Sequence, residues 1–200
     1  MGFMSVLSFA HKLVSERLTS GDRAIDATVG TGADTLALAK ITGARGEIYG
    51  FDIQAAALKL AEERLRLARE ETPALAAVTL LERSHAEMTE AVPANWSGTV
   101  SAVMFNLGYL PAGDADKKII TQPDSSITAL KASLQLLRPG GIITVVLYPG
   151  HAGGDLEAAA VEAWAAAIPS KEAQSIMYRQ LQRNDAPYVI ALEKKKGNPA

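Results

Sequence analysis

Residues 26–34 read DATVGTGAD, and no other stretch says more about the architecture of the chain. The residues before it are a short apolar run typical of a buried strand, and residues 33–41 after it have helical spacing. Gly30 and Gly32 allow a tight turn and a close approach of the backbone to a ligand, and the following helix offers free N–H groups. This order predicts the first strand–turn–helix unit of a nucleotide-binding α/β sheet.

The rest of the chain alternates between the hydrophobic periods of helices and strands. Helices are predicted over 4–19 (within an N-terminal helical segment 1–21), 33–41, 54–71, 125–137 and 154–168, and strands over 23–30, 47–53, 77–82, 101–106 and 142–148. A turn at residues 139–141 is expected to close the fourth of these helices, and residues 175–183 and 187–195 to form a terminal antiparallel pair. We expect one α/β domain over 1–196, mostly parallel with helices on both faces, and a disordered tail over 197–200.

Composition narrows the functional classes. A hydrophobic content of 48% with 21% charged residues is ordinary for a globular domain with a sizeable core. The net charge of −2 offers no general attraction to nucleic acid, so an RNA partner requires a local basic patch. There is no cysteine, which excludes disulfides and thiolate chemistry, and the three histidines are too scattered to predict a metal site. Without an evident leader or a membrane-spanning run, we expect a cytoplasmic protein.

Two acidic residues indicate which cofactor the glycine turn holds. Asp52 ends the next predicted strand, about twenty residues on, where a carboxylate suits the two hydroxyls of a ribose. A nicotinamide dinucleotide favours a third glycine, but position 35 is threonine. Asp26, four residues before Gly30, completes the D-x-x-x-G-x-G pattern common in enzymes that use S-adenosyl-L-methionine (SAM). The pattern favours SAM over NAD as the cofactor. It also favours a class I methyltransferase fold, whose seven strands have the order 3-2-1-4-5-7-6.

The predicted cofactor contacts lie at the ends of the first four strands. They are Asp26, Thr28, Gly30, Thr31, Gly32, Asp34, Thr35, Asp52, Ile53, Gln54, Ser84, His85 and Asn106.

The stretch Asn106-Leu107-Gly108-Tyr109 ends the fourth strand, beside the first strand in that order. Ligands of open α/β sheets bind beyond the carboxyl ends of the strands, so Asn106 is expected to face the transferred methyl group. Amine-modifying methyltransferases often place Asn/Asp-Pro-Pro-Tyr here, where the amide oxygen accepts the hydrogens of the amine and the aromatic ring stacks on the base. The alternative is that Asn106 caps the loop and Tyr109 packs as a lid.

Further substrate contacts are predicted on the same side of the sheet. Tyr148 and His151 follow the fifth strand, and His151 could accept a proton from an amine. Lys117 lies either near a phosphate or on a solvated surface. The catalytic candidates are thus Asn106, Tyr109 and His151, and the substrate-binding candidates are Leu107, Gly108, Tyr109, Lys117, Tyr148 and His151.

Several motifs together carry a resemblance to a known family. DATVGTGADT, MFNLGYLPAGD, LLRPGGIITVVLYPGHAGGDLE and the closing APYVIALEK resemble the YtqB-type methyltransferases over residues 8–195. The resemblance implies a SAM-dependent enzyme, commonly a homodimer, that methylates the 5-aminomethyl group of the modified wobble uridine in the tRNA anticodon to give 5-methylaminomethyl-(2-thio)uridine. Thr31 stands where the family usually has asparagine, and LQRNDAPY replaces its N-Q-x-N-x-P-P-F pattern. Methylation of rRNA or of a small-molecule amine, and a non-catalytic SAM-binding dimeric module, are the alternatives.

Overall fold

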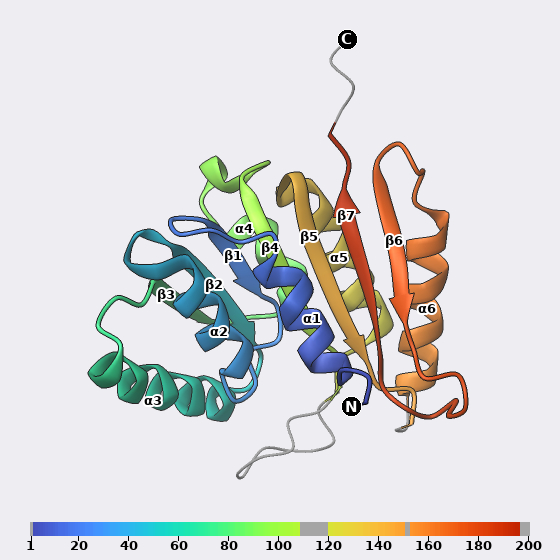
Figure 1. Cartoon of the computed structure of the whole chain (residues 1–200), viewed down its shortest axis with the longest axis horizontal. Helices are drawn as coiled ribbons and strands as arrows, with labels where there is room; N and C mark the ends of the chain where they lie inside the picture. The colour runs from blue at the N-terminus through green and yellow to red at the C-terminus, as the bar shows by residue number, and fades with distance from the viewer. Residues whose placement is uncertain (1, 109–119, 151–152, 197–200) are drawn as a thin grey trace.

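The computed structural model describes residues 2–108, 120–150 and 153–196, and its strands form one seven-stranded sheet (Figure 1). The order β3-β2-β1-β4-β5-β7-β6 confirms the prediction. Strands β1 to β5 pair in parallel, whereas β7 is antiparallel to both β5 and β6. The strand bounds are β1 Arg23–Asp26, β2 Glu47–Asp52, β3 Ala77–Glu82, β4 Val100–Asn106, β5 Leu137–Leu147, β6 Ala173–Tyr178 and β7 Tyr188–Lys194.

Helices cover both faces of this sheet. The α-helices are α1 Val6–Ser15, α2 Ala33–Thr42, α3 Ala55–Glu71, α4 Met88–Ala91, α5 Pro123–Leu136 and α6 Gly154–Ala167. Helices α1, α2 and α3 lie on the face turned to the viewer in Figure 1, and α4, α5 and α6 lie on the other. Within the described ranges, no helix is long and apolar enough to cross a bilayer.

The central strand β4 shows why its sequence is a continuous apolar run. Val103 and Phe105 belong to the hydrophobic core on the side of α5 and α6, whereas Ala102 and Met104 belong to the core on the side of α1 and α2. Successive side chains of a strand point to opposite faces, and both faces of this strand are buried. The apolar run therefore ends only at the carboxyl end of β4, where Asn106 is the last residue of the strand.

Several predicted boundaries differ from the structure, among them the end of the first helix, which is Ser15 and not residue 19. Strand β5 begins at Leu137, so residues 139–141 lie inside it, at a register shift against β4, and do not form a separate turn. Gly140 permits this irregularity because its φ is 76°. Strand β1 ends at Asp26, four residues early, because the Asp26 side chain accepts the N–H of Thr28 and starts the loop. Strand β6 ends at Tyr178, five residues before the predicted end.

Candidate active site

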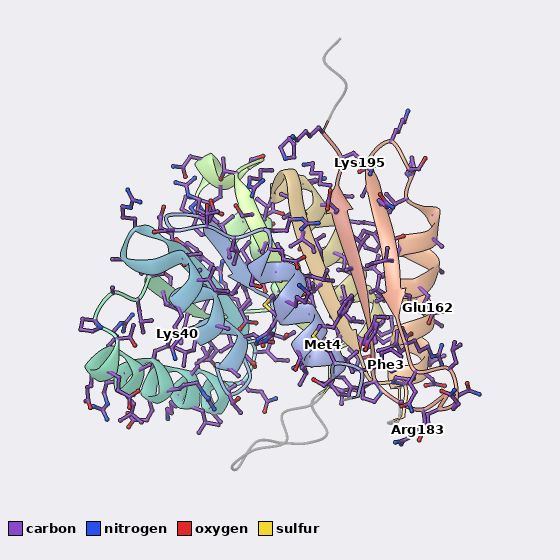
Figure 2. All side chains as sticks on the ribbon, viewed as in Figure 1. Phe3, Met4, Lys40, Glu162, Arg183 and Lys195 are labelled. Atoms are coloured by element: carbon purple, nitrogen blue, oxygen red, sulfur yellow. The ribbon has the colours of Figure 1, made fainter. Side chains whose placement is uncertain are left out.

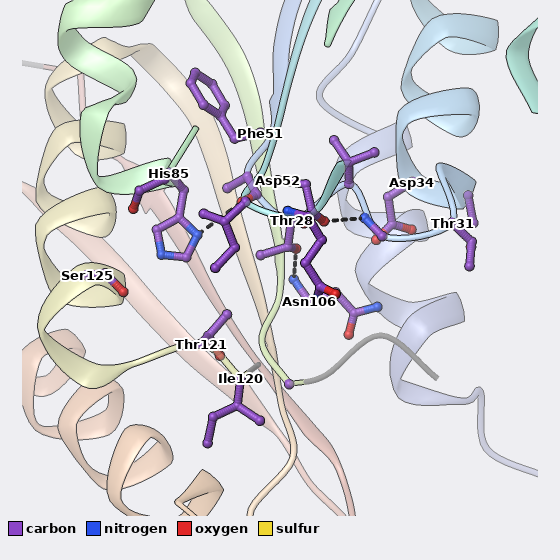
Figure 3. A pocket seen from close by; sticks show the side chains of 18 of the residues that line it. Thr28, Thr31, Asp34, Phe51, Asp52, His85, Asn106, Ile120, Thr121 and Ser125 are labelled. Atoms are coloured by element: carbon purple, nitrogen blue, oxygen red, sulfur yellow. Dashed lines mark hydrogen bonds between the residues drawn. The ribbon is translucent and has the colours of Figure 1, made fainter. Parts of the chain in front are cut away.

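A cavity of about 610 Å³ opens at the carboxyl ends of the parallel strands. Its wall combines helix α1, the loops after β1, β2 and β3, the end of β4, the residues around the start of α5, and Tyr148 after β5 (Figure 3). This is the edge at which an open α/β sheet binds its ligands, next to the point where the strand order reverses between β1 and β4.

The glycine loop after β1 is held by hydrogen bonds and by close packing on α3. The Gly30 N–H donates to Asp52 Oδ2 at 2.9 Å, which joins the loop to the end of β2. Gly32 has a φ of 76°, and a Cβ at this position would lie 2.7 Å from the Cβ of Ala61. Gly30 and Thr31 line the cavity, while Gly32 faces α3, so it shapes the loop without forming the wall.

Asp26 lies beneath this loop and is fully buried. Its carboxylate accepts hydrogen bonds from the Thr35 hydroxyl at 2.6 Å and from the Thr28 N–H at 3.1 Å. Burial, and then the charge of Asp34, raise the pKa of Asp26 to about 7. Asp26 and Thr35 do not line the cavity, so the structure gives them a role in supporting the loop rather than in forming its surface.

Asp52 does line the cavity, at the end of β2. One carboxylate oxygen accepts the Gly30 N–H, and the other accepts the Gln54 N–H at 2.9 Å. Ile53 is 56% exposed and also lines the cavity, so it offers an apolar surface next to the carboxylate. An acid held in this way at the second strand, beside an apolar side chain, can bind a ribose and the base attached to it.

His85 is nearly buried on the β3 side of the cavity, after Ser84, whose hydroxyl accepts the Ala86 N–H. Its Nδ1 lies 3.1 Å from the Ala27 carbonyl oxygen, and its Nε2 has no hydrogen-bond partner in the described protein. Burial lowers the pKa of His85, which favours the neutral ring with the proton on Nδ1. Nε2 is then a buried acceptor that a ligand with an N–H donor can satisfy.

Asn106 is fixed by the chain around it. Its N–H donates to the Thr28 hydroxyl at 2.7 Å, which ties the end of β4 to the glycine loop (Figure 3). Burial, and then the charge of Asp34, raise the pKa of Tyr148, whereas the Asn106 side chain beside it lowers that pKa. Both residues line the cavity, as does Gly108. The structure therefore brings these three predicted residues together on one cavity wall.

Helices α1 and α2 each contribute one residue to a further pair on the cavity wall. His11 Nε2 lies 2.5 Å from Asp34 Oδ1, and both residues line the wall together with Leu7. This hydrogen bond is the main reason why the pKa of His11 is raised despite partial burial. Asp34 was among the site residues predicted from the sequence, whereas His11 was not.

The prediction that the Leu107 side chain contacts the substrate is wrong. Leu107 is 1% exposed and packs in the hydrophobic core, and its N–H donates to the Val146 carbonyl at 2.9 Å. It alternates with Asn106 along the extended chain, so one of the two had to point inward. Tyr109, Lys117 and His151 lie outside the described residues.

Residues at the start of α5 were missed by the sequence analysis. Thr121 and Ser125 line the cavity, and Glu157 of α6 holds this segment. The Glu157 side chain is buried and accepts the hydroxyls of Thr121 and Ser126, each at 2.6 Å. Nothing in the local sequence marks Thr121, whereas Glu157 belongs to the motif after β5. No group of three or more His, Asp or Glu side chains in the described ranges could hold a metal.

Comparison with known proteins gives consistent matches. Residues 48–193 match a family model described as "Putative rRNA methylase". The chloroplastic tRNA (mnm5s2U34)-methyltransferase of Arabidopsis thaliana is 38% identical over 195 residues, which cover 94% of this chain and 68% of that protein. A solved structure from Clostridium thermocellum with the same description as the family is 33% identical, with a TM-score of 0.88, and the match covers 97% of this chain and 100% of that one. A "putative methyltransferase" from Streptococcus mutans in complex with S-adenosyl-L-homocysteine (SAH) is 29% identical, with a TM-score of 0.82 and coverages of 96% and 99%.

Proposed function

The chain belongs to the rRNA methylase family, and from this premise we propose that it is a SAM-dependent methyltransferase acting on tRNA. The acceptor is the 5-aminomethyl group of the modified wobble uridine, and the product is 5-methylaminomethyl-(2-thio)uridine. The observation that carries this proposal is the 38% identity, over nearly the whole chain, to an Arabidopsis protein whose name states this methylation. The SAH complex of the Streptococcus mutans relative supports the choice of cofactor.

The cavity fits SAM in its shape and its charge. Asp52, held by the N–H groups of Gly30 and Gln54, presents its carboxylate to the ribose hydroxyls. The exposed Ile53 side chain packs on the adenine, and the unpaired Nε2 of His85 accepts a hydrogen bond from the cofactor. Asp34 also faces the cavity, near the glycine loop. Its negative charge favours binding of the positively charged groups of SAM there.

The substrate amine binds at Asn106 and Tyr148. The Asn106 amide oxygen accepts a hydrogen from the amine, and the Tyr148 hydroxyl holds the amide in place. The nitrogen lone pair attacks the methyl carbon in line, and the electron pair of the breaking C–S bond goes to sulfur, which produces SAH. Positioning and exclusion of water lower the barrier by several kcal/mol, about the range of well-oriented intramolecular reactions.

The remaining predicted roles fall on residues outside the described ranges. Tyr109 stacks on the wobble base, Lys117 contacts a phosphate of the anticodon loop, and His151 contacts the substrate and is a candidate proton acceptor. These roles follow from the sequence motifs alone.

We also propose that the protein is a cytoplasmic homodimer. Ile176 and Met177 are each about half exposed on the edge strand β6. Phe3 and Met4 are exposed just before α1 (Figure 2). The Tyr178 hydroxyl donates to the Met4 carbonyl. An apolar sheet edge of this kind is suited to burial against a second copy. The cytoplasm is a compartment in which tRNA is used; the Arabidopsis relative acts in another such compartment, the chloroplast.

Labelled SAM and tRNA carrying the free aminomethyl group test the activity. We expect label in the wobble uridine, and no label in tRNA that lacks the aminomethyl group. Asn106→Ala should reduce methylation far more than SAM binding. Asn95→Ala, in an exposed 3-10 turn, is the matched control and should change neither. Label in rRNA or in small amines alone would favour the alternative acceptors. SAM binding without transfer to any acceptor would support the non-catalytic module.

A further inference from the structure

The pair of His11 and Asp34 joins two helices on the wall of the cavity. His11 projects from α1 and Asp34 from the first turn of α2, and 2.5 Å separates Nε2 from Oδ1. The side chains are 38% and 11% exposed, so the histidine reaches both the cavity and solvent, while the carboxylate is mostly enclosed. A base that is held by a buried acid and is open to solvent on its other side resembles the arrangement of many proton acceptors.

The groups around His11 are mostly acidic. Asp34 faces it from α2, the charge of Asp26 in β1 acts on it, and Tyr148 after β5 lies within the field of Asp34. On α1 itself, the neighbouring Lys12 pairs with Glu16 on the exposed surface. The hydrogen bond to Asp34, and then the charges of Asp34 and Asp26, raise the pKa of His11 above its usual 6.5.

His85 is the other described histidine in the cavity, and its surroundings differ. Its Nδ1 faces the Ala27 carbonyl, and burial lowers its pKa. Because only 8% of His85 is exposed and its Nδ1 is bonded to a backbone carbonyl, this neutral ring has little access to water. The described part of the cavity wall therefore contains one histidine that has both an orienting acid and access to solvent.

We propose that His11 is the general base that removes a proton from the substrate amine, and that Asp34 is the residue that orients it. The inference rests on the proposed amine methylation. In the neutral ring, Nε2–H donates to Asp34 Oδ1, so that Nδ1 carries the accepting lone pair. The substrate ammonium gives one proton to Nδ1, and its freed lone pair forms the N–C bond while the C–S bond breaks toward sulfur. The product leaves as a secondary ammonium, and His11 returns its proton to water.

Single-turnover methylation between pH 6 and 9, with SAM affinity measured in parallel, tests the assignment. In the wild type, the rate rises with pH as His11 loses its proton. His11→Gln keeps a donor toward Asp34 but cannot accept a proton, so the rate should fall by about 10²–10⁴-fold. SAM affinity should change by less than about threefold, the scale of one weakened exposed contact. Added imidazole should restore part of the rate in His11→Gly.

Two further variants separate positioning from chemistry. Asp34→Asn removes the charge that raises the pKa of His11, so the rising limb of the profile should move to lower pH and the maximal rate should fall. Ser15→Ala changes an exposed residue of the same helix and should leave both the rate and its pH profile unchanged.

Three results would overturn the assignment. One is a His11→Gln rate within about threefold of wild type, far less than general-base catalysis contributes. Another is an equal loss of SAM affinity and methylation, which would make His11 a cofactor-binding residue. The third is loss of the pH limb in His151→Gln while His11→Gln retains it. If wild-type protein transfers no methyl group to any amine, the proposed function itself fails and this inference fails with it.

Discussion

Replacing Gly32 by alanine should destabilise the protein by about 2–5 kcal/mol. Its φ of 76° is a left-handed conformation, which costs an alanine about 1–2 kcal/mol. The new Cβ would also lie 2.7 Å from the Cβ and 2.8 Å from the Cα of Ala61, so the glycine loop and α3 must move apart. Overpacking of this kind costs about 1–3 kcal/mol.

Gly98→Ala is the matched control for this substitution. Gly98 has a similar φ of 70°, but a Cβ there meets no atom within 4 Å. It should therefore lose only the conformational part, about 1–2 kcal/mol. The difference between the two variants isolates the steric clash against Ala61.

Urea unfolding measures both free energies, and melting temperatures should fall by about 2–4 °C for each kcal/mol in a protein of this size. The loop carries Gly30 and Thr31 on the cavity wall, so Gly32→Ala should also weaken SAM binding, whereas Gly98→Ala should not. Equal destabilisation of the two variants, or unchanged SAM affinity in Gly32→Ala, would refute the argument that contact with α3 sets the position of the loop.

The other predictions concern buried carboxylates and the cofactor site. The pKa of Asp26 is raised to about 7, so the folded state binds a proton more tightly than the unfolded state does. As the pH rises from about 4 to 7, the wild-type protein should therefore lose stability relative to Asp26→Asn. Unfolding curves of both proteins across that pH range measure this difference. A difference that does not vary with pH would contradict this. Asp52→Ala removes a charged acceptor from the proposed ribose site and should weaken SAM binding by about 1.5–3 kcal/mol in calorimetry, whereas unchanged affinity would place the ribose elsewhere. Glu157→Ala leaves the hydroxyls of Thr121 and Ser126 without their acceptor. It should cost about 1–3 kcal/mol for the buried Ser126 and less for the partly buried Thr121, in the same unfolding assay. Glu157→Gln should be less damaging, and equal losses in the two variants would assign the effect to packing.

Local patterns were sufficient to predict the order of elements and many of the residues that line the cavity. The two hydrophobic periods distinguished helices from strands, and the glycine turn with Asp52 indicated the class of fold. These signals succeed because they depend on neighbouring residues. A strand buried on both faces needs apolar residues throughout, and the end of such a strand is marked when a polar residue such as Asn106 appears.

Side-chain direction and long-range contacts needed the folded chain. Leu107 and Asn106 are adjacent in the motif, yet the structure places one in the core and the other on the cavity wall. Residues 139–141 have the composition of a turn but form an irregularity within β5, because pairing with β4 begins earlier than the local pattern predicts.

The pairing of His11 with Asp34 depends on tertiary structure most of all. The two residues are 23 positions apart, and periodicity alone predicts only that His11 is on the buried side of its helix. Their 2.5 Å contact exists because α1 crosses the sheet above β5 and reaches the first turn of α2. Hydrophobic spacing predicts which side of a helix or strand is buried. It does not predict which residue of another element a side chain contacts, because that depends on how separate elements pack. The proposed proton acceptor, His11, has its acidic partner only through that packing.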